Sequence, residues 1–153
     1  MKKYRLSLVQ MVNKGNLDSS IKSIQELIQI VSKLRTPGEG CPWDLEQTHD
    51  SLIPYLIEEA NEVVYAIRSK DTKNLEEELG DLLLQIVLHA QIAKEQNKFC
   101  IDKVAKNINK KLIRRHPHVF GNRKLNTVNE AKKIWDSIKQ SEEKSSSSNH
   151  PLS

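Results

Sequence analysis

Apolar residues recur every three or four positions along most of this chain, which is the spacing of one face of an α-helix. A first helix is predicted over residues 18–34, where Asp18 is a favourable N-cap. Its apolar stripe consists of Ile21, Ile24, Leu27, Ile28 and Val31. The segment 36–42 contains two prolines and two glycines, so it predicts a loop.

The same spacing predicts two longer helices, over residues 48–68 and 71–96, joined by a short turn. Pro54 is compatible with the first of them only if it lies close to the helix start. The apolar face of the second helix is wide, which predicts a central position; it comprises Leu75, Leu79, Leu82, Leu83, Ile86, Val87 and Ala90. Gly80 within it indicates either the close approach of a neighbouring helix or a metal site, or a tolerated weak point.

Two further helices follow, over residues 101–115 and 127–139. Pro117 stops the first of them, because proline cannot continue a helix. Thr127 and Glu130 have the spacing of a capping box at the start of the second.

These elements predict an all-α protein with one domain over residues 18–140, built as an antiparallel bundle of four to five helices. Strong apolar faces on so short a chain also suggest that helices pack across an oligomer interface. Residues 1–17 form an N-terminal extension whose order the pattern does not define. Residues 141–153 are serine-rich and have the composition of a disordered tail.

The composition agrees with one soluble domain: 153 residues, 37% hydrophobic and 29% charged, with only five glycines and five prolines. No apolar run approaches the ~18–20 residues of a membrane span. The basic N-terminus lacks the apolar core of a signal peptide, so a cytoplasmic location is expected. Cys41 and Cys100 do not form a metal-binding motif and are expected to be reduced thiols.

Carboxylates are paired on the two long helices, three positions apart in each pair, and therefore lie on one face. The pairs are Glu59 with Glu62 and Glu78 with Asp81. The short turn makes the two helices antiparallel neighbours, so the pairs can meet. Four carboxylates around one point need a cation, and oxygen-only ligation suits Mg²⁺ or Mn²⁺. A solvated charged face explains the same spacing, and the two interpretations stand side by side.

A basic segment follows, because residues 103–124 contain eight Lys or Arg and no acid. Lys111 and Arg115 share a helix face and could bind phosphate oxygens. A solvated face or a nucleic-acid patch would have the same composition. His116 and His118 are a weak metal motif and are better explained by structural or phosphate contacts.

The two tryptophans, Trp43 and Trp135, allow base stacking, although packing is the commoner role of tryptophan. The chain has no Gly-rich phosphate loop, which excludes a P-loop enzyme. It also shows no specific signal for Ser/His/Asp nucleophilic catalysis.

Five segments, in this order, resemble the MazG nucleoside triphosphate pyrophosphohydrolases: residues 40–44 (GCPWD), 47–49 (QTH), 55–62 (YLIEEANE), 77–85 (EELGDLLLQ) and 114–121 (RRHPHVFG). The resemblance runs from about Leu27 to Lys139. The acidic pattern alone would also fit dimeric dUTPases and phosphoribosyl-ATP pyrophosphatases of the wider all-α group.

The resemblance implies an all-α bundle of the NTP pyrophosphatase type that assembles as a homodimer or homotetramer. It implies Mg²⁺-dependent hydrolysis of a (deoxy)nucleoside triphosphate between the α and β phosphates, with Mn²⁺ as a substitute cation. The products would be the monophosphate and pyrophosphate. The biological role would be control of nucleotide pools or removal of non-standard nucleotides.

The resemblance also assigns residues. Its metal ligands would be Glu59, Glu62, Glu78 and Asp81. Glu58 would orient or deprotonate water, and Lys111 and Arg115 would be catalytic and would contact the substrate. Trp135 would also contact the substrate, and Trp43 is a further candidate for that role.

A rival hypothesis comes from another class of protein. On that hypothesis the chain is a non-catalytic helical module, and its basic helix binds nucleic acid or an acidic partner. The acids would then be only a solubilising face. The specific segments of the resemblance favour the enzyme, so nucleic acid is not the expected partner.

Overall fold

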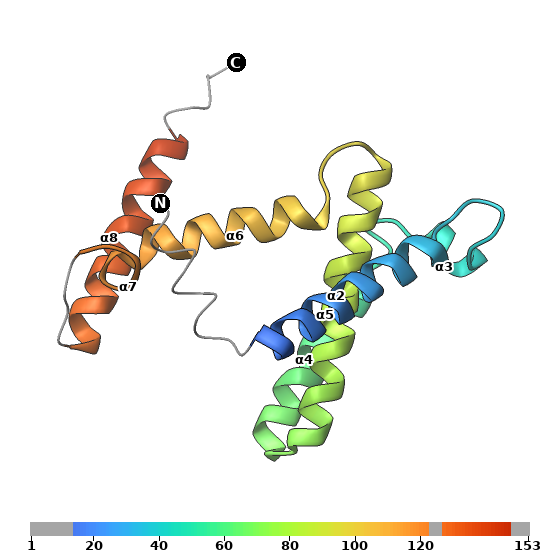
Figure 1. Ribbon diagram of the computed structural model, residues 1–153, viewed down its shortest axis with the longest axis horizontal. Coiled ribbons are helices and arrows are strands. Elements are labelled where there is room, and N and C mark those ends of the chain that lie inside the picture. Colours follow the sequence, from blue (N-terminus) through green and yellow to red (C-terminus); the bar gives the residue numbers. More distant parts are fainter. Residues whose placement is uncertain (1–13, 123–126, 148–153) are drawn as a thin grey trace. The chain divides into compact units, whose positions relative to one another are not determined.

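The computed structural model describes residues 14–122 and 127–147, with the side chains of 18–122 and 127–142. Within these residues the regular structure is entirely helical, which confirms the all-α class (Figure 1). The helices of the described residues are α2 (Lys14–Leu34), α3 (Pro42–Glu46), α4 (Ile53–Ser69), α5 (Thr72–Glu95), α6 (Ile101–Arg115), α7 (Pro117–Phe120) and α8 (Val128–Ser147). No described helix is long and apolar enough to cross a membrane.

The predicted boundaries of α4 were wrong at its start. Helix α4 begins at Ile53 rather than Thr48, because Pro54 lies in its first turn and cannot lie deeper. The residues just before it form turns instead, in which the Thr48 backbone N–H donates to the Ser51 hydroxyl at 2.9 Å. The short helix α3, which starts at Pro42, was not predicted.

Helices α4 and α5 form an antiparallel hairpin (Figure 1). Lys70 ends α4 in the left-handed conformation, with φ of 57°, and its N–H donates to the carbonyls of Ala66 and Ile67. Asp71 then caps α5, because its Oδ1 accepts from the backbone N–H groups of Lys73 and Asn74, each at 3.1 Å. This compact turn sets the height at which the two helices face each other.

The apolar core lies against the C-terminal half of α5, where α2 packs on it. Its buried members are Val31, Leu52, Val87, Leu88 and Ile92. Burying each such side chain contributes ~1.5–3 kcal/mol to stability. The N-terminal half of α5, which carries the acids, lies outside this core and pairs with α4.

Gly80 lies in the interior of α5, and a Cβ at this position would meet nothing within 4 Å. Within the described chain no neighbour approaches it closely.

Arg35 is a buried cation at the end of this packing, with 7% of its surface exposed. Its Nε and Nη2 donate to the Glu95 carboxylate, at 3.0 and 2.8 Å. Its Nη1 donates to the carbonyl oxygens of Asp44 and Gln47. Arg35 therefore ties α3 and the segment after it to the end of α5.

The C-terminal part of the chain, residues 105–153, forms a second compact unit and is described by itself. The Thr127 hydroxyl accepts from the Glu130 backbone N–H at 3.3 Å, as the capping box predicts. Helix α8 continues to Ser147, past the predicted end at Lys139 and into the segment where we expected disorder. Ion pairs of Glu142 with Arg114 and Arg115 hold this additional length in place.

Candidate metal centre and anion site

The first candidate site is a carboxylate cluster on the α4–α5 hairpin. Glu59 lies on α4, and Glu78 and Asp81 lie one turn apart on α5. One oxygen from each of these three carboxylates lies within 4.8 Å of the other two. Like charges repel at that separation, so the hairpin turn has placed together groups that gain from a shared cation.

Glu62 joins this cluster. Its carboxyl lies close enough to Glu59 and Glu78 to raise the pKa of both. The structure therefore brings together all four acids that the sequence selected, while their roles as ligands stay a prediction.

The close approach of these carboxylates raises the pKa values of two of them. Partial burial raises the pKa of Glu59, and the negative charges of Asp81 and the other neighbouring carboxylates raise it further. Partial burial also raises the pKa of Glu78, and the neighbouring Glu62 carboxyl adds to the effect. A divalent cation would relieve this repulsion, and a site built only of carboxylate oxygens fits a hard ion such as Mg²⁺.

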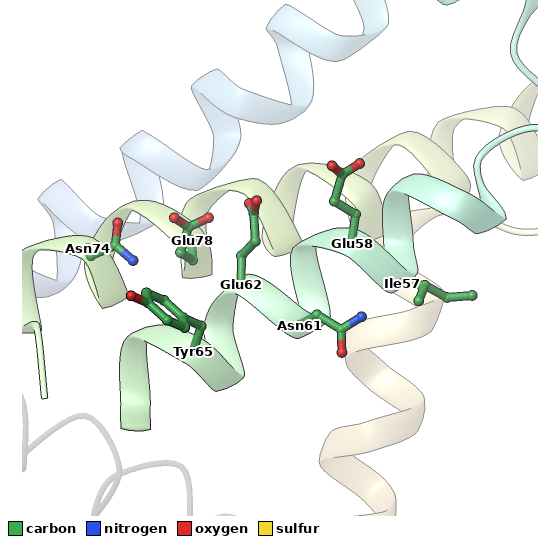
Figure 2. Close-up of a pocket in the computed structure, with 7 residues that line it drawn as sticks. All are labelled: Ile57, Glu58, Asn61, Glu62, Tyr65, Asn74 and Glu78. Atoms are coloured by element: carbon green, nitrogen blue, oxygen red, sulfur yellow. The ribbon is translucent and has the colours of Figure 1, made fainter. Parts of the chain in front are cut away.

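An open pocket of about 730 Å³ borders the cluster. Figure 2 shows that Glu58, Glu62 and Glu78 extend their carboxylates to the same side of the hairpin. Glu58 therefore lines the pocket without belonging to the cluster of Glu59, Glu78 and Asp81. A side chain in this position would lie next to a bound metal ion without being one of its ligands.

Sequence reasoning missed three polar side chains that line the pocket, namely Asn61, Tyr65 and Asn74. A signal for the first two was present, because positions 58, 61, 62 and 65 have the spacing of one helix face. Tyr65 is 70% exposed, so its ring is accessible to a ligand.

Trp43 lies on α3 and is 47% exposed. Its ring meets Tyr55 edge to face, with the ring centroids 5.6 Å apart. Tyr55 is one helical turn before Glu58 and Glu59 on α4. A partly exposed indole held in this way is able to stack on a flat ligand. That Trp43 contacts the substrate stays a prediction.

The second candidate site lies in the unit of residues 105–153. The Arg115 guanidinium lies over the Trp135 ring, 5.0 Å from its centroid. The His116 ring meets the same indole edge to face, with centroids 4.9 Å apart. Lys111, one turn before Arg115, is exposed. The structure thus brings Arg115 and Trp135 together. The indole of Trp135 lies under the guanidinium of Arg115, and that guanidinium can bind anions.

The two cysteines also follow the prediction. Cys41 and Cys100 are both free thiols, each half-buried. Neither forms a disulfide, so the fold is held by packing and polar contacts.

A carboxylate cluster that could hold a metal ion thus lies on a helical hairpin, and the regular structure of the described residues is helical throughout. The profile of the MazG nucleotide pyrophosphohydrolase domain matches residues 47–120. A solved structure, of a mazG-related protein from Thermotoga maritima, superposes with a TM-score of 0.63 at 31% identity and covers 76% of this chain and 98% of that one. The chain belongs to the MazG family.

Longer relatives share the domain. The nucleoside triphosphate pyrophosphohydrolase/pyrophosphatase MazG of Thermotoga maritima is 52% identical over 118 residues, which are 77% of this chain and 44% of that protein. The nucleoside triphosphate pyrophosphohydrolase of Escherichia coli K12 is 43% identical over 122 residues, or 80% and 46% of the two chains. The chain therefore spans less than half of the length of these curated relatives.

Proposed function

We propose that this chain is a Mg²⁺-dependent nucleoside triphosphate pyrophosphohydrolase, which cleaves a (deoxy)nucleoside triphosphate between its α and β phosphates. The observation that carries the proposal is the convergence of Glu59, Glu78 and Asp81, with the Glu62 carboxyl close to two of them. The names of the relatives support the same reaction. A role in nucleotide pools, and with it a cytoplasmic location, accords with such a substrate.

The four clustered carboxylates would hold the cation, with Mn²⁺ as a substitute for Mg²⁺. When bound, the metal supplies neutralisation of the phosphates and a lowered pKa of coordinated water. Glu58, beside the cluster, would accept the proton of the attacking water. Its carboxylate opens to the same pocket as Glu62 and Glu78, which supports this role.

The basic helix would serve the leaving group. Lys111 and Arg115 would offset the negative charge that develops on pyrophosphate as the bond breaks. Trp135, which already stacks with Arg115, would fix that guanidinium against the substrate. Trp43 is the candidate for contact with the base, supported by its exposure.

We further propose that the hairpin is completed as a four- to five-helix antiparallel bundle by a second copy, in a homodimer or homotetramer. Large apolar side chains of α4 and α5 support this because they are exposed: Ile57, Val64, Ile67, Leu79, Leu83 and Ile86. Light scattering of the purified chain tests it. A monomer at micromolar concentration would contradict it.

The test of the activity is pyrophosphate release from a panel of canonical and modified nucleotides, with Mg²⁺ and with EDTA. Hydrolysis in ¹⁸O-labelled water shows which phosphorus is attacked, because label in the monophosphate marks attack at the α phosphate. Glu62→Gln should abolish metal-dependent turnover, whereas Glu76→Gln, at an exposed acid of the same hairpin, should retain it.

Absence of pyrophosphate release from any nucleotide would refute the enzyme. In that case, strongly salt-dependent binding to nucleic acid would favour the helical interaction module instead.

A further inference from the structure

Two consecutive arginines at the end of α6 bind one carboxylate, that of Glu142 on α8. Arg115 Nη2 and Nε donate to Glu142 Oε2, at 2.7 and 3.2 Å. Arg114 Nε donates to Glu142 Oε1 at 2.6 Å. Both carboxylate oxygens are therefore held, each by a different guanidinium.

This arrangement is a built anion site. The Arg115 side chain is only 14% exposed and lies over Trp135, so its guanidinium is fixed before any ligand arrives. The two guanidiniums lower the pKa of Glu142 to about 2, which shows how strongly the pair favours a negative charge at this point. A guanidinium fork matches phosphate oxygens as well as it matches a carboxylate.

The Glu142 carboxylate and a substrate phosphate would compete for the same N–H donors of Arg115. Glu142 occupies the Nε and Nη2 edge of Arg115, one of the two edges through which a guanidinium makes a two-point contact with phosphate. A phosphoryl group can therefore reach this edge of Arg115 only when the Glu142 carboxylate has left it.

Departure of the carboxylate would need a rotation of the Glu142 side chain. The Glu142 side chain is 21% exposed and lies one turn beyond the half-buried Ile138, so it has solvent to rotate into. Arg114 is 55% exposed and can follow an incoming anion.

We propose that Arg114 and Arg115 form a binding site for phosphoryl groups, and that Glu142 is an internal competitor that closes this site until a phosphorylated ligand displaces it. The inference rests on the proposed function only for the identity of the natural ligand, a nucleotide. Its chemistry requires only an anion with phosphate geometry. If the open form is about a tenth of the population, the apparent affinity for the ligand is reduced about tenfold.

The test uses the full chain, with inorganic pyrophosphate as the probe, in EDTA, by isothermal titration calorimetry. Glu142→Gln removes the negative charge while keeping the size of the side chain, and Glu142→Ala removes the competitor altogether. Both should tighten pyrophosphate binding by about three- to tenfold. Asp136→Asn, the same charge change at an exposed position of α8, should change it less than twofold.

A double-mutant cycle separates competition from a general charge effect. Arg115→Lys removes the fork, so Glu142→Gln should have a much smaller effect on pyrophosphate binding in that background. Unchanged or weaker binding by both Glu142 variants overturns the proposal. Weaker binding with lost helical circular dichroism overturns it too, since Glu142 would then only hold α8 in place.

The outcome is independent of turnover. Pyrophosphate binding is measured without metal or nucleotide, so it tests the internal competitor even if no nucleotide is hydrolysed. If hydrolysis is found, Glu142→Gln should lower the KM for the nucleotide while Asp136→Asn leaves it unchanged. An unaltered KM in Glu142→Gln would contradict the competition.

Discussion

The guanidinium of Arg35 binds the carboxylate of Glu95 at 2.8 Å, although sixty residues separate them along the chain. The contact joins the residue that follows α2 to the last residue of α5. The Arg35 side chain is 6% exposed and that of Glu95 is 34% exposed, so water only partly screens the pair. This ion pair thus links the end of α2 to the end of α5, two helices that contribute to the apolar core.

Arg35→Met should destabilise the fold by about 2–3 kcal/mol, because it leaves Glu95 and two backbone carbonyls without their donor. The figure is below that for a fully buried pair, since Glu95 is partly exposed. Lys33→Met is the control: Lys33 pairs with Glu39 at the surface and should cost less than about 1 kcal/mol. Urea unfolding measures both. Equal losses would show that burial of Arg35 contributes nothing.

The same pair predicts an acid-dependent loss of stability. Partial burial alone would raise the pKa of Glu95, but hydrogen bonds from Arg35 and Gln91 outweigh it, and the pKa lies below its usual value. The ion pair therefore stabilises the fold at pH values above the unfolded pKa of Glu95, about 4.3. This stabilisation is lost as the pH falls through the lower pKa of Glu95 in the folded state. Glu95→Gln should flatten the stability curve below about pH 5, and a curve parallel to wild type would contradict this.

His49 and His89 predict a second pH effect. Their Nδ1 atoms are 2.9 Å apart, so only one of the two can donate, and the rings are stacked. Partial burial lowers the pKa of His89, and the neighbouring His49 lowers it further. Below about pH 6.5 the unfolded chain binds a proton that folded His89 resists, so stability should fall there.

The measurement is the free energy of unfolding between pH 8 and pH 5.5, for the wild type and for His89→Gln. The variant should lose much less stability on acidification than the wild type does. Identical slopes would show that another group titrates in this range.

Two glycines should respond oppositely to the same substitution. Gly80→Ala should stabilise the fold by up to ~1 kcal/mol, since helix propensity improves and the added Cβ meets nothing within 4 Å. Gly40→Ala should destabilise it, because its Cβ would lie 2.1 Å from the Leu34 carbonyl oxygen. Thermal unfolding compares them. Destabilisation by Gly80→Ala would point to close packing at α5 by a second copy.

Long periodic segments were predictable, whereas short or distant interactions were not. Helix α5 was predicted over 71–96 and spans Thr72–Glu95, because many apolar positions repeat the same signal. Helix α3 has five residues, too few to show a period. The Arg35–Glu95 contact depends on how α2 crosses α5, which local pattern does not specify.

The same distinction applies to the sites. The four clustered acids were predictable because both pairs have i, i+3 spacing and a short turn joins their helices. Glu142 was missed, because the serine-rich composition around it indicated disorder. Its two arginine partners lie 27 and 28 residues away, on another helix. The composition of a segment indicates whether it folds by itself. It does not show that cations on another helix hold the segment in place.

The carboxylate cluster predicts opposite effects of one substitution with and without metal. Glu62→Gln removes a charge from a crowded group, so in EDTA the variant should be as stable as the wild type or more stable. With Mg²⁺ at 100 times its Kd the wild type should gain about 2.7 kcal/mol, and the variant much less. Glu76→Gln, exposed on α5, should respond to Mg²⁺ as the wild type does. Thermal unfolding across a Mg²⁺ titration measures all three, and an equal gain in Glu62→Gln would remove Glu62 from the ligand set.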